Sequence, residues 1–133
     1  MLKHVICTSQ DDESNSPAWK NWSVISIADS GAQDAKLQFG WLHILHLNFD
    51  DIEYEDGEHL LFDEMHARSI LEFVEQCNDE NVEGILVHCR EGFSRSGAVA
   101  KWICQKVGLS FPVHFDRYNK HVYTVLGQVQ IVL

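Results

Sequence analysis

The sequence predicts a single α/β domain of three layers, with a mainly parallel central sheet flanked by helices. Short apolar runs typical of strands alternate along the chain with segments whose apolar residues recur every three or four positions, as on one face of a helix. No low-complexity tract or linker divides the 133 residues, which suffice for one hydrophobic core but hardly for two. We therefore expect one domain over residues 1–133.

Four segments have the composition of β-strands, and they cover residues 4–9, 23–31, 41–49 and 85–88. The run 85–88, Ile-Leu-Val-His, is apolar without alternation, as in strands that are buried on both faces of a parallel sheet. Residues 11–22 carry acidic residues and serines before Pro17 and indicate a loop or a short helix. The polar, acidic stretch 50–59 contains a glycine and indicates a loop.

Three segments have the periodicity of amphipathic helices. The first extends from about Leu60 to Cys77, with its apolar face formed by Ala67, Ile70, Leu71, Val74 and Cys77. The second begins after Ser96, presents Val99, Trp102, Ile103 and Val107 on one face, and has Gly108 as its expected C-cap, with Pro112 just beyond. The last contains Tyr118, Val122, Val125, Leu126 and Val129, and Asp116 is its expected N-cap.

The charge of the chain excludes some classes of partner. Twenty acidic residues against ten basic ones give a net charge of −10 at pH 7. Phosphate backbones and anionic membranes require clustered Lys and Arg, so we expect neither nucleic acid nor a membrane as partner. The four tryptophans are then core or pocket-rim aromatics. No apolar run is long enough to cross a bilayer and the first residues lack a signal-peptide pattern, so we expect a cytoplasmic location.

The four cysteines are Cys7, Cys77, Cys89 and Cys104. None belongs to a C-x-x-C pair, and no Cys/His cluster has the spacing of a zinc site, so we expect no metal, no cofactor and no disulfide framework. We expect Cys7, Cys77 and Cys104 to be buried and to pack as small hydrophobic residues. Cys89 differs because it lies at the turn between a predicted strand and a predicted helix.

Residues 88–96, His-Cys-Arg-Glu-Gly-Phe-Ser-Arg-Ser, have the composition of an anion-binding loop. A five-residue loop that leads into a helix can direct its backbone N–H groups inward, and Gly92 suits a position of positive φ. The guanidinium of Arg95 matches two oxygens of a tetrahedral anion, and the helix N-terminus adds positive potential. The predicted phosphate-binding residues are Arg90, Glu91, Gly92, Phe93, Ser94 and Arg95.

The same features stabilise a thiolate, so Cys89 is the predicted nucleophile beneath a bound phosphate. Attack on phosphorus would form a cysteinyl-phosphate, with the loop amides and Arg95 stabilising the transferring group. Ser96 can donate a hydrogen bond to the sulfur when it becomes the leaving group. We expect His88 to hold the loop in place and Glu91 to anchor the guanidinium of Arg95.

The pattern H-C-x-x-G-x-x-R-S in these residues resembles the signature of the protein tyrosine phosphatase superfamily, especially the small atypical dual-specificity phosphatases. The resemblance covers roughly residues 1–126, although upstream only the order of elements matches. It implies a cysteine-dependent phosphatase domain acting on phosphoproteins or phosphopeptides, at phosphotyrosine and also at phosphoserine or phosphothreonine. Two departures stand out: Gly97 replaces the proline usual after the final serine, and no phosphotyrosine-recognition loop of the large tyrosine phosphatases is visible.

Such a reaction needs a proton donor for the leaving oxygen. The resemblance implies an aspartate two residues after the last apolar residue of an upstream strand, which selects Asp51 after Phe49. Asp50 is the alternative, because side chains alternate along a strand and the two carboxyl groups would point to opposite sides.

Three rival functions stay open at this stage. A rhodanese-like sulfurtransferase also holds a cysteine in a cradle of backbone amides. A phosphatase of this type can act on a phosphoinositide, a nucleotide or an RNA 5′ end, although the acidic chain and the few basic residues near the loop disfavour polyanions. A phosphate-binding protein without turnover would more often have lost Cys89 or the aspartate.

Overall fold

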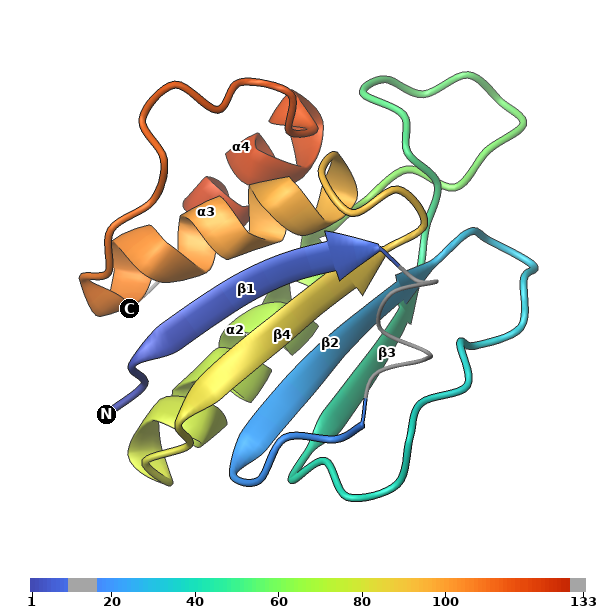
Figure 1. Cartoon of the computed structure of the whole chain (residues 1–133). Coiled ribbons are helices and arrows are strands. Elements are labelled where there is room, and N and C mark those ends of the chain that lie inside the picture. Colours follow the sequence, from blue (N-terminus) through green and yellow to red (C-terminus); the bar gives the residue numbers. More distant parts are fainter. Residues whose placement is uncertain (10–16, 130–133) are drawn as a thin grey trace.

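Among the residues that the structure describes, four parallel strands form the centre of the fold (Figure 1). The computed structural model describes residues 1–9 and 17–129. Its strands are β1 (His4–Ser9), β2 (Trp22–Ala28), β3 (Ile44–Asn48) and β4 (Gly84–Cys89). Its helices are α2 (Glu64–Asp79), α3 (Arg95–Val107) and α4 (Lys120–Val129). The predicted α/β class and parallel sheet are confirmed, and part of the predicted segment 11–22 lies outside the described residues.

The strand order is β1-β4-β2-β3, which places β4 inside the sheet with all six of its residues buried. The register pairs Ser9 with Cys89 and Ser26 with His88. Because all strands are parallel, their carboxyl ends meet at one edge of the sheet. The segments that follow β2, β3 and β4 therefore come together at that edge, although they are far apart in sequence.

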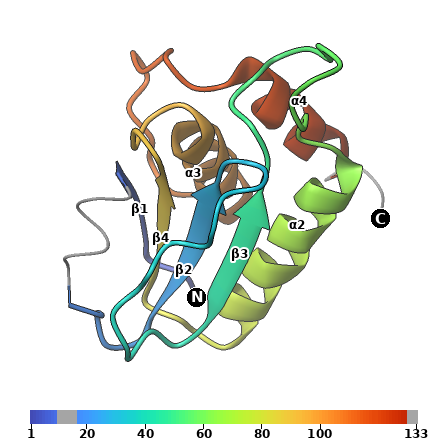
Figure 2. The same cartoon turned by 90° about the vertical axis from the view of Figure 1, so that its right-hand side faces the viewer.

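The two faces of the sheet are covered differently. Ile25, Ile27, Ile85 and Val87 belong to one core cluster with buried residues of all three described helices. On the opposite face, Val24 and Leu86 pack against Trp41 and against four partly buried residues, which are Ala18 and Trp19 before β2, Trp22 at its start and Leu37 in the loop that joins β2 to β3. Figure 2 shows the helices on one side of the sheet and the loop that joins β2 to β3 on the other. The third layer is thus built of loop segments, where we had expected flanking helices.

Two helices begin later than predicted because of where their caps lie. Helix α2 begins at Glu64, since the carboxylate of Asp63 accepts hydrogen bonds from the N–H groups of Met65 (2.9 Å) and His66 (3.2 Å). Helix α4 begins at Lys120, and the prediction of Asp116 as its cap is wrong: the side chain of Asn119 accepts from Val122 N–H at 3.0 Å.

The end of α3 is as predicted, with Gly108 as C-cap at φ 80°. Within the described residues, no helix combines the length and the apolar character needed to cross a membrane.

Candidate active site

Cys89 ends β4, and its sulfur is surrounded by hydrogen-bonding groups of its own loop. The N–H groups of Gly92 and Ser96 donate to Sγ at 3.3 and 3.4 Å, and Ser96 Oγ lies 3.2 Å from it. Gly92 has φ 89°, and a Cβ there would come within 2.6 Å of Ser9 N in β1. A glycine is therefore required both by conformation and by the close packing of the loop on β1.

Arg95 is the first residue of α3 and is 1% exposed. Its Nη1 donates to the carbonyl of Phe49 at 2.7 Å and forms an ion pair with Asp29 Oδ1 at 2.9 Å. Its Nε is buried and has no hydrogen-bond partner among the described residues. A buried N–H that the protein leaves unpaired is costly, and an anion held in the loop would satisfy it.

The anchor of Arg95 differs from the one expected. Glu91 is exposed and forms no ion pair with Arg95 in the described part of the chain, so that prediction is wrong. Asp29 serves instead, and its second oxygen lies 3.4 Å from the mostly exposed Arg90. Asp29 directly follows β2, so a search for the first polar residue after each parallel strand would have found it.

The two candidate acids occupy different environments. The exposed Asp51 lies against the cysteine loop, where its Oδ1 accepts from Ser94 Oγ at 2.8 Å and from Asn119 Nδ2 at 2.9 Å. Asp50 is 8% exposed and accepts from the N–H and hydroxyl of Ser30 (2.9 and 2.5 Å) and from Leu60 N–H (2.7 Å). Burial raises the pKa of Asp50, but the hydrogen bonds from Ser30 and Leu60 outweigh it and lower the pKa overall. An ionised, fully bonded Asp50 is suited to holding its loop.

Phe93 and Gly97 pack against the segment that precedes α4. Phe93 is half-buried, and the guanidinium of Arg117 lies 4.3 Å from the centre of its ring. Gly97 stands where the phosphatases that residues 88–96 resemble usually have proline. It donates its N–H to Phe93 O at 3.0 Å, and a Cβ there would meet the ring of Phe115 at 2.7 Å. A proline would lose that hydrogen bond and collide with that ring, so local packing accounts for the glycine.

The other three cysteines lie outside this arrangement of donors. Cys77 and Cys104 are buried and Cys7 is partly buried, and none forms a disulfide. Burial raises the pKa of all three thiols, and for Cys7 the neighbouring Cys89 adds to the effect. They behave as the small apolar residues that the sequence predicted. No three His, Cys, Asp or Glu side chains within the described ranges gather into a metal-binding group.

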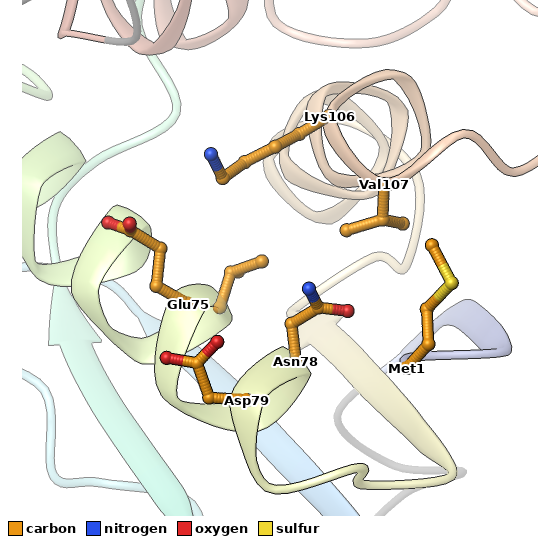
Figure 3. A pocket seen from close by; sticks show the side chains of 7 residues that line it. Met1, Glu75, Asn78, Asp79, Lys106 and Val107 are labelled. Carbon is orange, nitrogen blue, oxygen red and sulfur yellow. The ribbon is translucent and has the colours of Figure 1, made fainter. Parts of the chain in front are cut away.

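Two cavities in the described part of the chain differ in their position relative to the cysteine loop and in their chemistry. One, of about 320 Å³, is mainly apolar and borders the cysteine loop at Gly92 and Phe93. The other, of about 230 Å³, lies between the ends of α2 and α3 and is lined by Met1, Val74, Glu75, Asn78, Asp79, Lys106 and Val107 (Figure 3). The second offers neither a thiol nor a hydroxyl group and mixes both signs of charge. The candidate nucleophile and the anion-binding donors therefore lie at the cysteine loop and not in the second cavity.

His88 is fully buried beside Cys89, and burial, with a smaller effect of His46, lowers its pKa to about 4. The ring is therefore neutral at physiological pH. In the unfolded chain its pKa is near the ordinary value of about 6.5, so between these values the unfolded state binds more protons. The stability that depends on the neutral ring is complete above pH 6.5 and falls as the pH drops toward 4.

We expect the free energy of unfolding to drop by roughly 2 kcal/mol between pH 7 and pH 5 because of this one residue. Urea unfolding of the wild-type protein and of His88→Asn at pH 7 and pH 5 measures it. The variant has no titrating ring at this position and should lose that part of the pH dependence. An equal drop in both proteins would contradict the assignment.

The comparisons with known proteins concern the fold. No family model matches the sequence, and no curated protein matches it. Among solved structures, the chain resembles human tyrosine phosphatase-like serine/threonine/tyrosine-interacting protein, with a TM-score of 0.65 and 16% sequence identity. The match covers 96% of this chain and 91% of that chain. The chain therefore has the fold of a tyrosine phosphatase-like protein, and the resemblance predicted from residues 88–96 is confirmed at the level of fold.

Proposed function

We propose that this chain is a cysteine-dependent phosphatase that hydrolyses phosphomonoesters of proteins, phosphotyrosine first and phosphoserine or phosphothreonine in addition. The observation that carries the proposal is the sulfur of Cys89 among donors, in a loop that is followed at once by a buried arginine with an unpaired Nε–H. A buried donor without a partner at the start of a helix suits a bound oxyanion.

The proposed reaction has two steps. In the first, Cys89 Sγ attacks phosphorus, the P–O ester bond breaks, and Asp51 gives its proton to the leaving oxygen. In the second, water attacks the cysteinyl-phosphate, Asp51 takes a proton from that water, and the S–P bond breaks to release inorganic phosphate. Ser96 Oγ, 3.2 Å from the sulfur, stabilises the departing thiolate. The loop amides and Arg95 stabilise the charge on the transferring group in both steps.

The surroundings favour a single phosphate group over a polyanion. Asp29 and Asp51 lie at the loop, and the net charge of the chain is −10. A highly charged head group or an RNA end would meet these carboxylates with few compensating cations. We therefore place phosphoproteins ahead of phosphoinositides, nucleotides and RNA 5′ ends.

The decisive assay is hydrolysis of p-nitrophenyl phosphate in the presence of EDTA, with and without vanadate. We expect turnover that EDTA leaves unchanged and vanadate inhibits, together with a phosphoenzyme that can be trapped by acid quench. Sulfur transfer from thiosulfate to cyanide without phosphate release would establish the rhodanese-like alternative. Phosphopeptide binding without turnover would instead indicate a binding protein, a role that the phosphatase-like neighbour makes worth testing.

Asp51→Asn is expected to lower kcat for phenyl phosphate by about 10²–10⁴-fold, since a poor leaving group needs the proton. The loss for p-nitrophenyl phosphate should be much smaller. Asp50→Asn should instead lower the melting temperature, because it weakens the bonds to Ser30 and Leu60, and should leave the ratio of the two substrates unchanged. A selective loss with phenyl phosphate in Asp50→Asn would exchange the two roles.

A further inference from the structure

Asn119, at the start of α4, links three segments that the proposed reaction uses or depends on. It is 2% exposed. Its backbone N–H donates to Ser94 O in the cysteine loop at 3.0 Å. Its side-chain Nδ2 donates to Asp51 Oδ1 at 2.9 Å and to Ile52 O at 3.0 Å, and its Oδ1 accepts from Val122 N–H at 3.0 Å.

These bonds fix the orientation of the amide group. An asparagine side chain offers two N–H donors and one carbonyl oxygen, and all three are used here. The reversed orientation would place the carbonyl oxygen against the carboxylate of Asp51 and the carbonyl of Ile52, and would turn the NH₂ group toward the N–H of Val122. Every contact would then be repulsive, so the network allows one arrangement only.

The loop that carries Asp51 has no helix or strand of its own between Phe49 and Asp63. An exposed aspartate on such a loop loses rotamer freedom when it is aligned for proton transfer, and anchoring it in advance removes that cost. Asn119 and Ser94 both bond to the same oxygen, Oδ1, while Oδ2 accepts no hydrogen bond from the described residues. Oδ2 is thus the oxygen left to carry the proton.

We propose that Asn119 is a positioning residue for the general acid: by holding Oδ1 of Asp51 and the carbonyl of Ile52, it aims Oδ2 at the leaving group above the cysteine loop. This inference rests on the proposed phosphatase function and deepens it. Asn119 does not touch the reacting atoms. Its effect on turnover should therefore act only through Asp51.

Two variants separate this role from capping of α4. Serine and aspartate are good N-caps, so Asn119→Ser and Asn119→Asp keep a side-chain oxygen for Val122. Neither supplies the amide donors, and aspartate adds a charge that repels Asp51. We expect kcat for phenyl phosphate to fall about 10- to 100-fold in both, part of the full contribution of a general acid, with less than about threefold change for p-nitrophenyl phosphate. The limb of the pH–rate profile that reports the protonated acid should shift or flatten.

Three controls complete the test. Asp116→Asn, in the same connection but without a bond to Asp51, should leave both rates unchanged. The vanadate inhibition constant should be unchanged in Asn119→Ser, which adds no charge, because anion binding does not need the acid. In an Asp51→Asn background, Asn119→Ser should cause no further loss, since coupled residues act as one unit.

The outcomes are distinct. No turnover by the wild-type protein overturns the proposed function and this inference with it. Turnover by the wild-type protein, with Asn119→Ser equal to it on phenyl phosphate, overturns the inference alone. So does an equal loss on both substrates, or a full additional loss in the Asp51→Asn background, because each indicates a general structural role.

Discussion

Cys89→Ser is expected to lower kcat for p-nitrophenyl phosphate by at least about 10⁴-fold, the scale seen when a covalent nucleophile is removed. A serine hydroxyl is a weak nucleophile unless a base takes its proton. The groups that contact Sγ are the N–H groups of Gly92 and Ser96, which donate to it, and the hydroxyl oxygen of Ser96, which accepts from the thiol; none of them acts as a base at neutral pH. This site stabilises an anion and cannot create an alkoxide.

Binding of the anion should survive the same substitution, because the donors and Arg95 remain. Isothermal titration with inorganic phosphate is expected to give an affinity within about threefold of the wild-type protein, less than 1 kcal/mol. Cys104→Ser is the matched control, since it makes the same change at a buried cysteine of α3 outside the loop. It should keep its turnover. Hydrolysis by Cys89→Ser above about 1% of the wild-type rate would show that the sulfur is not the nucleophile.

The cysteine loop was predictable because its residues are local in sequence. A buried strand, a glycine with φ 89°, an arginine and the start of a helix all fall between residues 85 and 97. The parallel sheet was predictable for a similar reason, since each strand is a short apolar run followed by polar residues. The topology then brings the carboxyl ends of the strands together without further information.

The long-range partners were not predictable in the same way. Glu91 was expected to anchor the guanidinium of Arg95, whereas Asp29 does so from the end of another strand. The alternation of side chains along a strand predicted that Asp50 and Asp51 point to opposite sides, but it did not say which of them faces the cysteine loop. That choice depends on the backbone N–H groups of Ser30 and Leu60, which bind Asp50 and leave Asp51 to Ser94.

The pattern of the strands also did not predict which segments cover the two faces of the sheet. Residues of β2 and β4 are apolar on both faces, which requires two covering layers but does not identify them. One face is covered by helices, and the other by aromatic residues of loops around Trp41. The tryptophans were predicted as core or pocket-rim residues, but scattered aromatic residues carry no periodicity, so the pattern did not show that they form this layer.

Arg95→Lys is expected to reduce kcat/KM for p-nitrophenyl phosphate by about 10²–10³-fold, the cost of removing one preorganised donor from an anion site. The guanidinium uses Nη1 for both Phe49 O (2.7 Å) and Asp29 (2.9 Å), which leaves the buried Nε–H for the substrate. A lysine carries one ammonium group, so it can remain with Asp29 or reach the phosphate but cannot provide the planar pair of donors. Charge is conserved in this variant, and only the geometry of the donors is tested.

The contrast with the cysteine variant makes the result specific. Arg95→Lys should weaken binding of inorganic phosphate in titration as well as turnover, whereas Cys89→Ser should affect turnover alone. Asp29→Asn should produce a smaller loss of about tenfold, less than the cost of a full donor, because the carbonyl of Phe49 still holds Nη1. Arg68→Lys, at an exposed arginine of α2 paired with Glu64, is the matched control and should change neither quantity. If Arg95→Lys kept phosphate affinity and kcat/KM within about threefold of the wild-type protein, less than 1 kcal/mol, the unpaired Nε–H would not be an anion donor and the loop would need another source of positive charge.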